Sequence, residues 1–409
     1  MINGARLLEH IERLSQIGRT KDGGVTRFSY TKEEAEANEL VKSYMEQAGL
    51  ETTYDSVGNL IGIKRGQTGY PTILLGSHID TVPNGGKYDG ALGVLAAIEV
   101  LHSMAEQKIE LHHTVKIYAF KDEEGSRFGI GMIGSRAVAG SLTPEMLEKR
   151  DRNGISLKEA MKQAGFHPDS IEQAKLDDVK CYLELHIEQG KVLESHNVGV
   201  GIVSGIAGPL WLKVKVAGLA EHAGATPMDQ RKDALAGASE MILAIEKLAK
   251  KYPEAVATVG SINVHPNGTN VIPGYTEFTI DIRHVQELTR DQLERDIKQA
   301  IASIAKSRGL SYEIEELQRV APCPCSESIQ DVIKTSIEEQ GLQAVTLPSG
   351  AGHDGMQFKD KWPIGMIFVR SKDGLSHNPK EFSSKEDIIL ATEVFYRTLQ
   401  KLDERFSVR

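Results

Sequence analysis

The spacing of hydrophobic positions predicts a chain in which helices and strands alternate. Within residues 33–48, apolar side chains recur at the three- and four-residue spacing of an amphipathic helix, and Gly49 follows as a stop signal. A second helical stretch covers residues 91–106. Buried strands are expected at the short apolar runs 73–75, 115–120 and 182–185. Strands that alternate with helices in this way predict an α/β sheet with parallel strands.

The pattern changes near residue 209. Residues 211–218 alternate with period two, which is typical of a half-buried strand. The following elements are expected to be a helix at 232–251, strands at 255–264 and 276–284, a helix at 290–307 and a strand at 311–318. This βαββαβ order predicts a ferredoxin-like domain. A helix at 327–340 then resumes the first pattern.

These elements predict an α/β protein in two parts. We expect a discontinuous catalytic domain, residues 1–208 and 326–409, with helices on both faces of a mixed, largely parallel sheet. A ferredoxin-like domain is expected to be inserted at residues 209–325.

Composition narrows the class of protein. The chain has 409 residues, of which 40% are hydrophobic and 26% charged, enough for two or three folded domains. A net charge of −9 argues against non-specific binding to nucleic acids or acidic membranes. No apolar run approaches the roughly 18–20 residues that span a bilayer. The N-terminus lacks a signal-peptide core, and three cysteines make no disulfide framework, so a cytoplasmic protein is expected. Cys323 and Cys325, separated by a proline, are assigned no role.

Polar side chains suited to metal binding follow three predicted strands. They are His78 and Asp80 after the first run, Glu123 and Glu124 after the second, and His186 after the third. In open α/β sheets, ligands bind beyond the carboxyl ends of the strands, so we expect these groups to share one rim. Imidazole and carboxylate suit Mn, Co, Ni or Zn, among which metal availability decides.

The candidate ligands are sufficient for two ions. A two-metal site needs a carboxylate that bridges both ions, and Asp89 suits this role because nearby glycines allow a close approach of the backbone. We assign the first ion to His78, Asp89 and His186, and the second to Asp89, Glu124 and His377. Asp80 is expected to orient the His78 ring. Glu123 is expected to stay free as the general base and acid for an activated water.

Any single one of the 13 histidines is more often a surface or core residue than a ligand. It is the joint occurrence of these groups at strand ends that favours a metal site. His10, His102, His112, His113, His167 and His196 are therefore assigned no functional role.

With these groups, the sequence resembles a known family, the dinuclear metallohydrolases of the aminoacylase and carboxypeptidase G type. It is most similar to their N-carbamoyl-L-amino-acid hydrolase and allantoate amidohydrolase branch. The peptidase members usually place a carboxylate where His186 stands, whereas His186 followed by Ile-Glu-Gln-Gly marks this branch. The motifs that carry the resemblance are GSHIDTVPNGGKYDGALGV (76–94), FKDEEGSRFGIGMIGS (120–135), ELHIEQG (184–190), AEHAGATPM (220–228), NVIPG (270–274), DIRH (281–284), SGAGHD (349–354) and SHNPKEF (376–382).

The resemblance implies the metal ligands already assigned, Glu123 as acid and base, and a substrate-binding set. That set is Gln189, His222, Asn270, Arg283 and the backbone around Gly350 and Ala351. The resemblance also implies a homodimer formed through the inserted domain, in which His222 reaches the active site of the partner. An arginine fork such as that of Arg283 holds a carboxylate bidentately, and His222 and Asn270 could stabilise an oxyanion.

The sequence therefore predicts the hydrolysis of N-carbamoyl-L-amino acids to the free amino acid, ammonia and carbon dioxide. Three alternatives stay open. Allantoate hydrolysis uses the same ureido chemistry, and an aminoacylase or peptidase activity belongs to the same family. A metal-binding protein without activity would have lost Glu123 or a ligand, and all of them are present. Side-chain preference and stereochemical strictness stay open as well.

Overall fold

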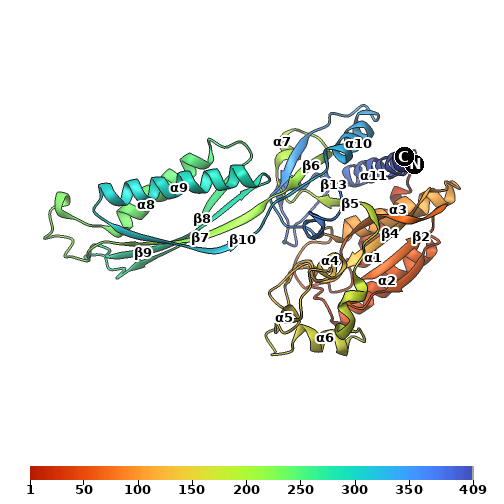
Figure 1. Cartoon of the computed structure of the whole chain (residues 1–409), viewed down its shortest axis with the longest axis horizontal. Helices are drawn as coiled ribbons and strands as arrows, with labels where there is room; N and C mark the ends of the chain where they lie inside the picture. The colour runs from red at the N-terminus through yellow and green to blue at the C-terminus, as the bar shows by residue number, and fades with distance from the viewer. Residues whose placement is uncertain (408–409) are drawn as a thin grey trace. The chain divides into compact units, whose positions relative to one another are not determined.

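The computed structural model describes residues 1–407, which divide into two compact units (Figure 1). Among the described residues, the first unit comprises 1–204, 325–347 and 353–407. The second comprises residues 205–324 and the short segment 348–352. Each unit has its own hydrophobic core.

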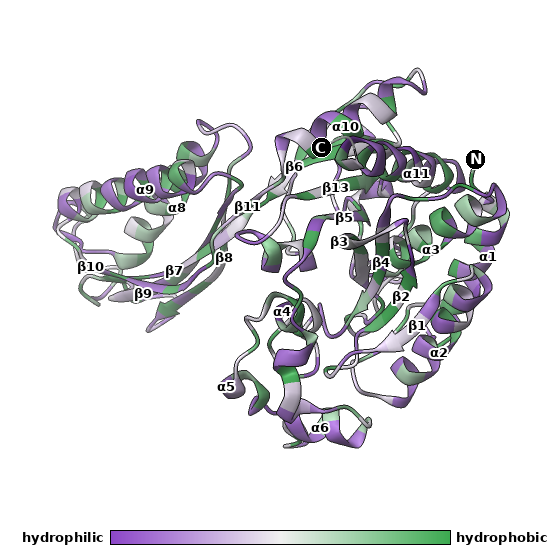
Figure 2. Ribbon diagram, turned by 45° about the vertical axis from the view of Figure 1, so that its right-hand side comes forward, coloured by the Kyte–Doolittle hydropathy of each residue, from purple (hydrophilic) through white to green (hydrophobic). Residues whose placement is uncertain are grey.

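A mixed sheet forms the centre of the first unit. The strands lie in the order β1-β2-β4-β3-β5-β13-β6-β11, with β12 beside β6, and Figure 2 shows this succession from β13 to β1. The four central strands β4, β3, β5 and β13 are parallel, and the flanking pairs are antiparallel. The predicted mixed α/β architecture is thus confirmed. The strands are β1 (Glu51–Tyr54), β2 (Leu60–Lys64), β3 (Thr68–His78), β4 (His113–Phe120), β5 (Val179–Ile187), β6 (Val200–Ile206), β11 (Cys323–Pro324), β12 (Thr346–Ser349) and β13 (Ile364–Val369).

Helices cover both faces of this sheet. Alternate strand residues such as Ile117 and Leu183 join the core beneath α1, α2, α3, α10 and α11. Their neighbours Phe120 and Tyr182 point to the other face, where their rings contact Phe358. The helices of the first core are α1 (Gly4–Leu14), α2 (Lys32–Gln47), α3 (Ala91–Glu106), α10 (Glu327–Glu338) and α11 (Lys385–Ser407).

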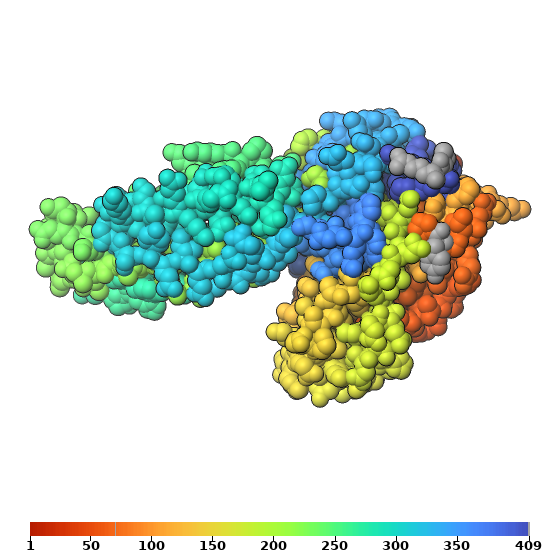
Figure 3. Space-filling model, in the orientation of Figure 1, coloured from red at the N-terminus to blue at the C-terminus, as the bar shows by residue number. Residues whose placement is uncertain are grey.

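A smaller core holds the segment that follows β4. It contains α4 (Ile133–Ala139), α5 (Pro144–Leu147), α6 (Leu157–Gln163) and the 3-10 helix Pro168–Ala174, which gather as the yellow lobe of Figure 3. A short helix, α7 (Val192–Ser195), follows β5. Further 3-10 turns are formed by Met228–Gln230, Asp354–Phe358 and Lys372–Gly374.

The second unit is a four-stranded antiparallel sheet with two helices on one face (Figure 1). Its elements are β7 (Gly208–Ala217), α8 (Ala234–Ala249), β8 (Val256–His265), β9 (Tyr275–His284), α9 (Glu287–Ser307) and β10 (Ser311–Arg319). The sheet order β10-β7-β9-β8 with this βαββαβ sequence confirms the ferredoxin-like prediction. Leu210 and Leu212 of β7 are buried under the helices, whereas Trp211 between them is 40% exposed on the open face.

Within residues 1–407, no helix is both long and apolar enough to cross a membrane.

Candidate active site

The parallel register places the predicted ligands at one rim of the central sheet. His78 is the last residue of β3 and lies opposite Phe120, the last residue of β4. Leu75 of β3 pairs with Leu183 of β5. His78 and His186 each lie three residues further along their strands, so they reach the same level at this edge of the sheet. Glu123 and Glu124 follow β4 within one short turn, so the strand ends deliver all these side chains to the same edge.

Asp89 lies between two groups of ligands. Its Oδ1 is 3.2 Å from His186 Nε2 and 3.9 Å from His78 Nε2. Its Oδ2 is 3.1 Å from His377 Nε2, which lies 3.4 Å from Glu124 Oε1. In each group of three the potential ligand atoms lie within 4.8 Å of one another. The two sets predicted from the sequence are therefore brought together around Asp89, and their assignment to two ions stays a prediction.

The backbone orients two of the imidazoles. Nδ1 of His78 lies 3.0 Å from the carbonyl oxygen of Asp80, and Nδ1 of His186 lies 2.9 Å from that of Ile187. A carbonyl only accepts hydrogen bonds, so each Nδ1 carries a proton, and each Nε2 faces Asp89 as the nitrogen that a metal ion would bind. Gly90, at φ +62°, lies against the His78 ring, which a Cβ at this position would meet.

Asp80 contacts the His78 ring through its backbone carbonyl, and its carboxylate has other partners. The carboxylate Oδ1 lies 3.7 Å from His78 Nδ1, and the closer contact is that of the backbone carbonyl. The two carboxylate oxygens instead accept hydrogen bonds, each of 3.2 Å, from the backbone N–H groups of Glu123 and Glu124. Asp80 thus fixes the turn that carries both glutamates, a role that its spacing from His78 does not reveal.

Three residues in the loops of the site have left-handed backbone conformations. They are Asp122 (φ +52°), Gln189 (φ +58°) and His377 (φ +54°). Non-glycine residues rarely adopt positive φ and keep it only where surrounding contacts hold them. Contacts within the site therefore hold these three loop positions in a conformation that the backbone alone does not favour.

The electrostatics of the site favour bound positive charge. Burial and the carboxylate of Asp89 raise the pKa of Glu124 to about 8, and burial beside Glu124 raises the pKa of Glu123 well above its usual range. Burial also acts to raise the pKa of Asp89, but hydrogen bonds from His186 and His377 outweigh it and hold that pKa well below its usual range. The hydrogen bond to Asp89 raises the pKa of His377 to about 9. Crowded carboxylates of this kind are stabilised by protons or by cations.

The donor set fits divalent metal ions. Imidazole nitrogens and carboxylate oxygens are the ligands of borderline ions such as Zn, Mn, Co and Ni. Glu124 Oε1 is buried and accepts no hydrogen bond from residues 1–407, as expected for an oxygen that would bind a cation. Glu123 lies 3.7 Å from His78 Nε2, close enough to exchange a proton with a water molecule held in the cluster.

Gln189 lies beside the bridging carboxylate. Its Nε2 donates to Asp89 Oδ2 and to Ser376 Oγ, each at 3.1 Å. Its Oε1 is buried and has no hydrogen-bond partner among the residues that the structure describes. A buried acceptor of this kind costs free energy unless a donor reaches it, and a substrate N–H could be that donor.

The sequence interpretation missed two buried side chains of the site. His353 stacks edge to face on His186, with ring centroids 4.4 Å apart, and shares a potential metal-binding group with Glu184. Glu381 accepts hydrogen bonds from the backbone N–H groups of Tyr88 and Asp89. Both residues stand in the quoted motifs SGAGHD and SHNPKEF, but neither follows a predicted strand.

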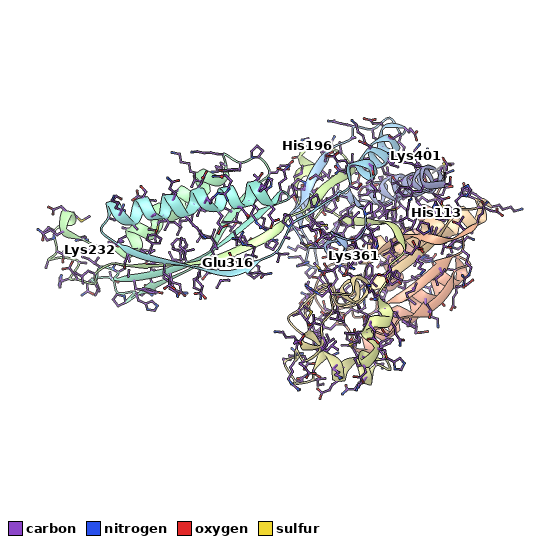
Figure 4. The ribbon with its side chains drawn as sticks, in the orientation of Figure 1. His113, His196, Lys232, Glu316, Lys361 and Lys401 are labelled. Atoms are coloured by element: carbon purple, nitrogen blue, oxygen red, sulfur yellow. The ribbon has the colours of Figure 1, made fainter. Side chains whose placement is uncertain are left out.

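The remaining predicted substrate-binding residues belong to the second unit, in two places. His222 forms a β-bridge with Val271, and the N–H of Ala223 donates to the carbonyl of Asn270, near the start of β9. Arg283, near the end of β9, donates from Nη1 to the carbonyl of Gly350 at 2.6 Å, and Ser349 Oγ donates to that of Ala351. Lys232, whose carbonyl accepts from Leu219 in the loop before His222, marks this end of the unit in Figure 4.

Two histidines that were assigned no functional role have other surroundings. Nδ1 of His113 lies 2.9 Å from Asp403, and His196 is exposed after α7 (Figure 4). Neither belongs to a group of potential metal ligands among residues 1–407.

Comparisons with known proteins find similar sequences and structures along almost the whole chain. Residues 74–401 match the model of peptidase family M20/M25/M40. The chain is 50% identical over 405 residues to the N-carbamoyl-L-amino acid amidohydrolase of Geobacillus stearothermophilus, covering 98% of this chain and 99% of that protein. It is 39% identical over 399 residues to the allantoate amidohydrolase of Bacillus subtilis, covering 97% of each. A solved amidase of the hydantoinase/carbamoylase family from Burkholderia multivorans superposes with a TM-score of 0.91 at 32% identity and 97% coverage of both chains.

Proposed function

Because this chain belongs to peptidase family M20/M25/M40 and is a hydrolase acting on C–N bonds, we propose that it hydrolyses N-carbamoyl-L-amino acids with two bound divalent ions. The observation that carries the proposal is the position of Asp89. One of its carboxylate oxygens faces His78 and His186, and the other faces His377 beside Glu124. A carboxylate shared in this way is what a two-metal site requires.

The bound ions would polarise the ureido carbonyl and lower the pKa of a water molecule. The protein supplies the movement of protons. Glu123 takes the proton of the attacking water and returns it to the leaving nitrogen. Asp80 keeps Glu123 in place through the hydrogen bond to its backbone N–H. The overall reaction adds one water molecule to the ureido group and releases the amino acid, ammonia and carbon dioxide.

Arg283 is the proposed binding site for the substrate carboxylate. A guanidinium has five N–H groups. Nε and Nη2 bind Asp281, and Nη1 binds the carbonyl of Gly350, which leaves one N–H on each of Nη1 and Nη2. The ion pair with Asp281 at 2.7 Å holds the guanidinium in place, so these two groups are presented in a fixed orientation.

Gln189 supports a ureido substrate over a peptide. Its partnerless Oε1 can accept a hydrogen bond from the terminal NH₂ of a carbamoyl group. An acyl or peptidyl substrate has no N–H at that position and would leave the buried oxygen unsatisfied. A buried polar group that is left without its partner discriminates between similar substrates more strongly than a small difference in apolar contacts does.

His222 and Asn270 are proposed to stabilise the tetrahedral oxyanion from a second copy of the chain. Within one chain, their loops lie near Tyr275 at the start of β9 and Arg283 lies near its end. Eight residues of strand separate the two places by about 27 Å. A small substrate cannot reach both, so a substrate bound to Arg283 of one chain must take His222 from another.

The strand β8 is a suitable surface for the second copy. It is an edge strand of ten residues, VATVGSINVH, without Asp, Glu, Lys or Arg, and its Val256 and Ile262 are 52% and 43% exposed. The opposite edge strand, β10, carries charged residues such as Glu313 and Glu315. Natural edge strands are usually protected by charges, so the uncharged edge favours pairing with another chain.

A substrate panel on metal-reconstituted protein tests the proposal. It comprises N-carbamoyl-L-methionine, its D-isomer, allantoate, β-ureidopropionate and a dipeptide. We expect the highest kcat/KM with N-carbamoyl-L-methionine. A higher kcat/KM with allantoate would favour the second candidate, which the similarity to the Bacillus subtilis enzyme supports. Preferred cleavage of the dipeptide, or no turnover of any compound, would contradict a ureido hydrolase.

Substitution of Arg283 by alanine should mainly raise KM. Loss of a charge-assisted hydrogen-bonded pair costs about 1.5–3 kcal/mol, which corresponds to roughly 10- to 150-fold in kcat/KM. The effect should be confined to substrates with a carboxylate, measured against N-carbamoyl-L-methioninamide. Arg295→Ala, on the exposed side of α9, is the matched control. An equal loss on the acid and the amide would remove the carboxylate-binding role.

A further inference from the structure

The segment that supplies His377 also holds the backbone of the bridging ligand. Glu381 is 5% exposed, and its Oε1 accepts hydrogen bonds from the N–H groups of Tyr88 at 2.8 Å and Asp89 at 3.2 Å. Its Oε2 accepts from Ser376 Oγ at 2.9 Å. One carboxylate thus links residues 88–89 to residues 376–381, far apart in the sequence.

Ser376 lies between two carboxylates and can donate its hydroxyl hydrogen bond to only one of them at a time. Its Oγ is 2.9 Å from Glu381 Oε2 and 3.1 Å from Asp89 Oδ2. A serine hydroxyl has one proton to donate. Gln189 Nε2 donates to the same Oγ, so the lone pairs of the hydroxyl are engaged from the other side.

We propose that Glu381 is a positioning residue for Asp89 in two respects. Its Oε1 fixes the backbone of the bridging ligand, and its Oε2 takes the proton of Ser376. Asp89 Oδ2, the oxygen that faces His377, then remains an acceptor for a cation rather than for a hydroxyl proton. The inference rests on the proposed two-ion site and concerns the ion shared by Asp89, Glu124 and His377.

Gly86 provides the space for this arrangement. A Cβ at position 86 would overlap the carboxylate of Glu381. The φ angle of Gly86 is not in the left-handed region, so an alanine there would be unfavourable because of Glu381 and not because of the backbone. Gly86→Ala therefore displaces Glu381 without changing its chemistry.

The decisive variant is Glu381→Gln. The amide keeps the size of the side chain and an oxygen for Tyr88 and Asp89, but its NH₂ cannot accept the Ser376 proton. The Ser376 hydroxyl then donates its hydrogen bond to Asp89 Oδ2, where its proton competes with the cation. We expect the second Mn²⁺ to bind roughly 10- to 100-fold more weakly, as is typical for loss of a hydrogen bond to a metal ligand. Gly86→Ala should weaken the same ion.

A second substitution separates the two roles of Glu381. In Glu381→Gln, the further change Ser376→Ala removes the competing proton and should restore most of the Mn²⁺ affinity. Binding is measured without substrate, from the EPR signal of free Mn²⁺ during titration of the full chain, with thermal melting of the metal-free protein to verify folding. Glu386→Gln, an exposed glutamate in the first turn of α11, is the control.

The outcomes are distinguishable. Second-ion affinity equal to that of the parent protein in both Glu381→Gln and Gly86→Ala would overturn the inference. Equally weak binding with and without Ser376→Ala would overturn the proton-directing role. A parent protein that binds fewer than two Mn²⁺ ions would contradict the proposed two-ion site itself.

Discussion

Glu123→Gln should leave both ions bound and lower kcat by about 10²–10⁴-fold. This is the range that general acid–base catalysis contributes, because the amide can neither take the proton of water nor return it to nitrogen. The substitution keeps the backbone N–H that Asp80 binds, so the turn with Glu124 is expected to persist. Metal content and kcat, determined on the same preparation, check both parts of the prediction.

A glutamate elsewhere in the first unit provides the comparison. Glu99 is buried and binds Arg6 at 2.7 Å, far along α3 from the metal cluster. Glu99→Gln should lower stability while kcat changes little. Near-native kcat in Glu123→Gln would show that another group moves the proton, whereas lost metal would show that Glu123 is a ligand.

His222→Ala should lower kcat by about 10²–10³-fold, the usual cost of one lost oxyanion donor. Mixing it with inactive Glu123→Gln should restore activity if His222 acts across a dimer. Each mixed dimer then has one site with both Glu123 and His222 intact, so the isolated mixed dimer should show about half of the parent activity per site, and the unseparated statistical mixture about a quarter. The measurement is kcat after joint refolding or co-expression, with the mixed dimer isolated by two affinity tags.

The oligomeric state provides the control for this mixing experiment. Ile262→Lys places a charge on the exposed edge of β8 and should separate the copies while each chain stays folded. Complementation should then disappear. Verified mixed dimers without recovered activity would place His222 outside the partner's reaction, and an active monomer would do the same.

Hydrophobic periodicity is sufficient to predict the longer helices and strands of the fold. The pattern over 33–48 predicts α2, which spans Lys32–Gln47, and the period-two pattern over 211–218 predicts most of β7. The strands β1, β2 and β6 were not assigned. These strands are short or contain glycines such as Gly62 and Gly201, so their apolar pattern is weak. Their extended conformation depends on pairing with neighbouring strands, which the local sequence does not show.

The candidate ligands could be predicted because parallel strands end at a common edge. His78 and His186 needed only the strand positions and that rule. Asp80 and Glu381 could not be assigned their contacts in this way. Both act by accepting hydrogen bonds from backbone N–H groups in loops, and the loop at Asp122, with positive φ, has a path that no side-chain pattern encodes.

The length of strand β9 determines a distance between two functional positions of the second unit. With Arg283 at one end and the loop of His222 at the other, its residue count determines how far apart these two proposed substrate contacts of one chain lie. Adding or deleting two residues would keep every side chain on its face and change that span by about 7 Å. On the proposed assignment these two contacts serve two different active sites of a dimer, so the length of this strand would set the spacing of those two sites and not the length of the substrate.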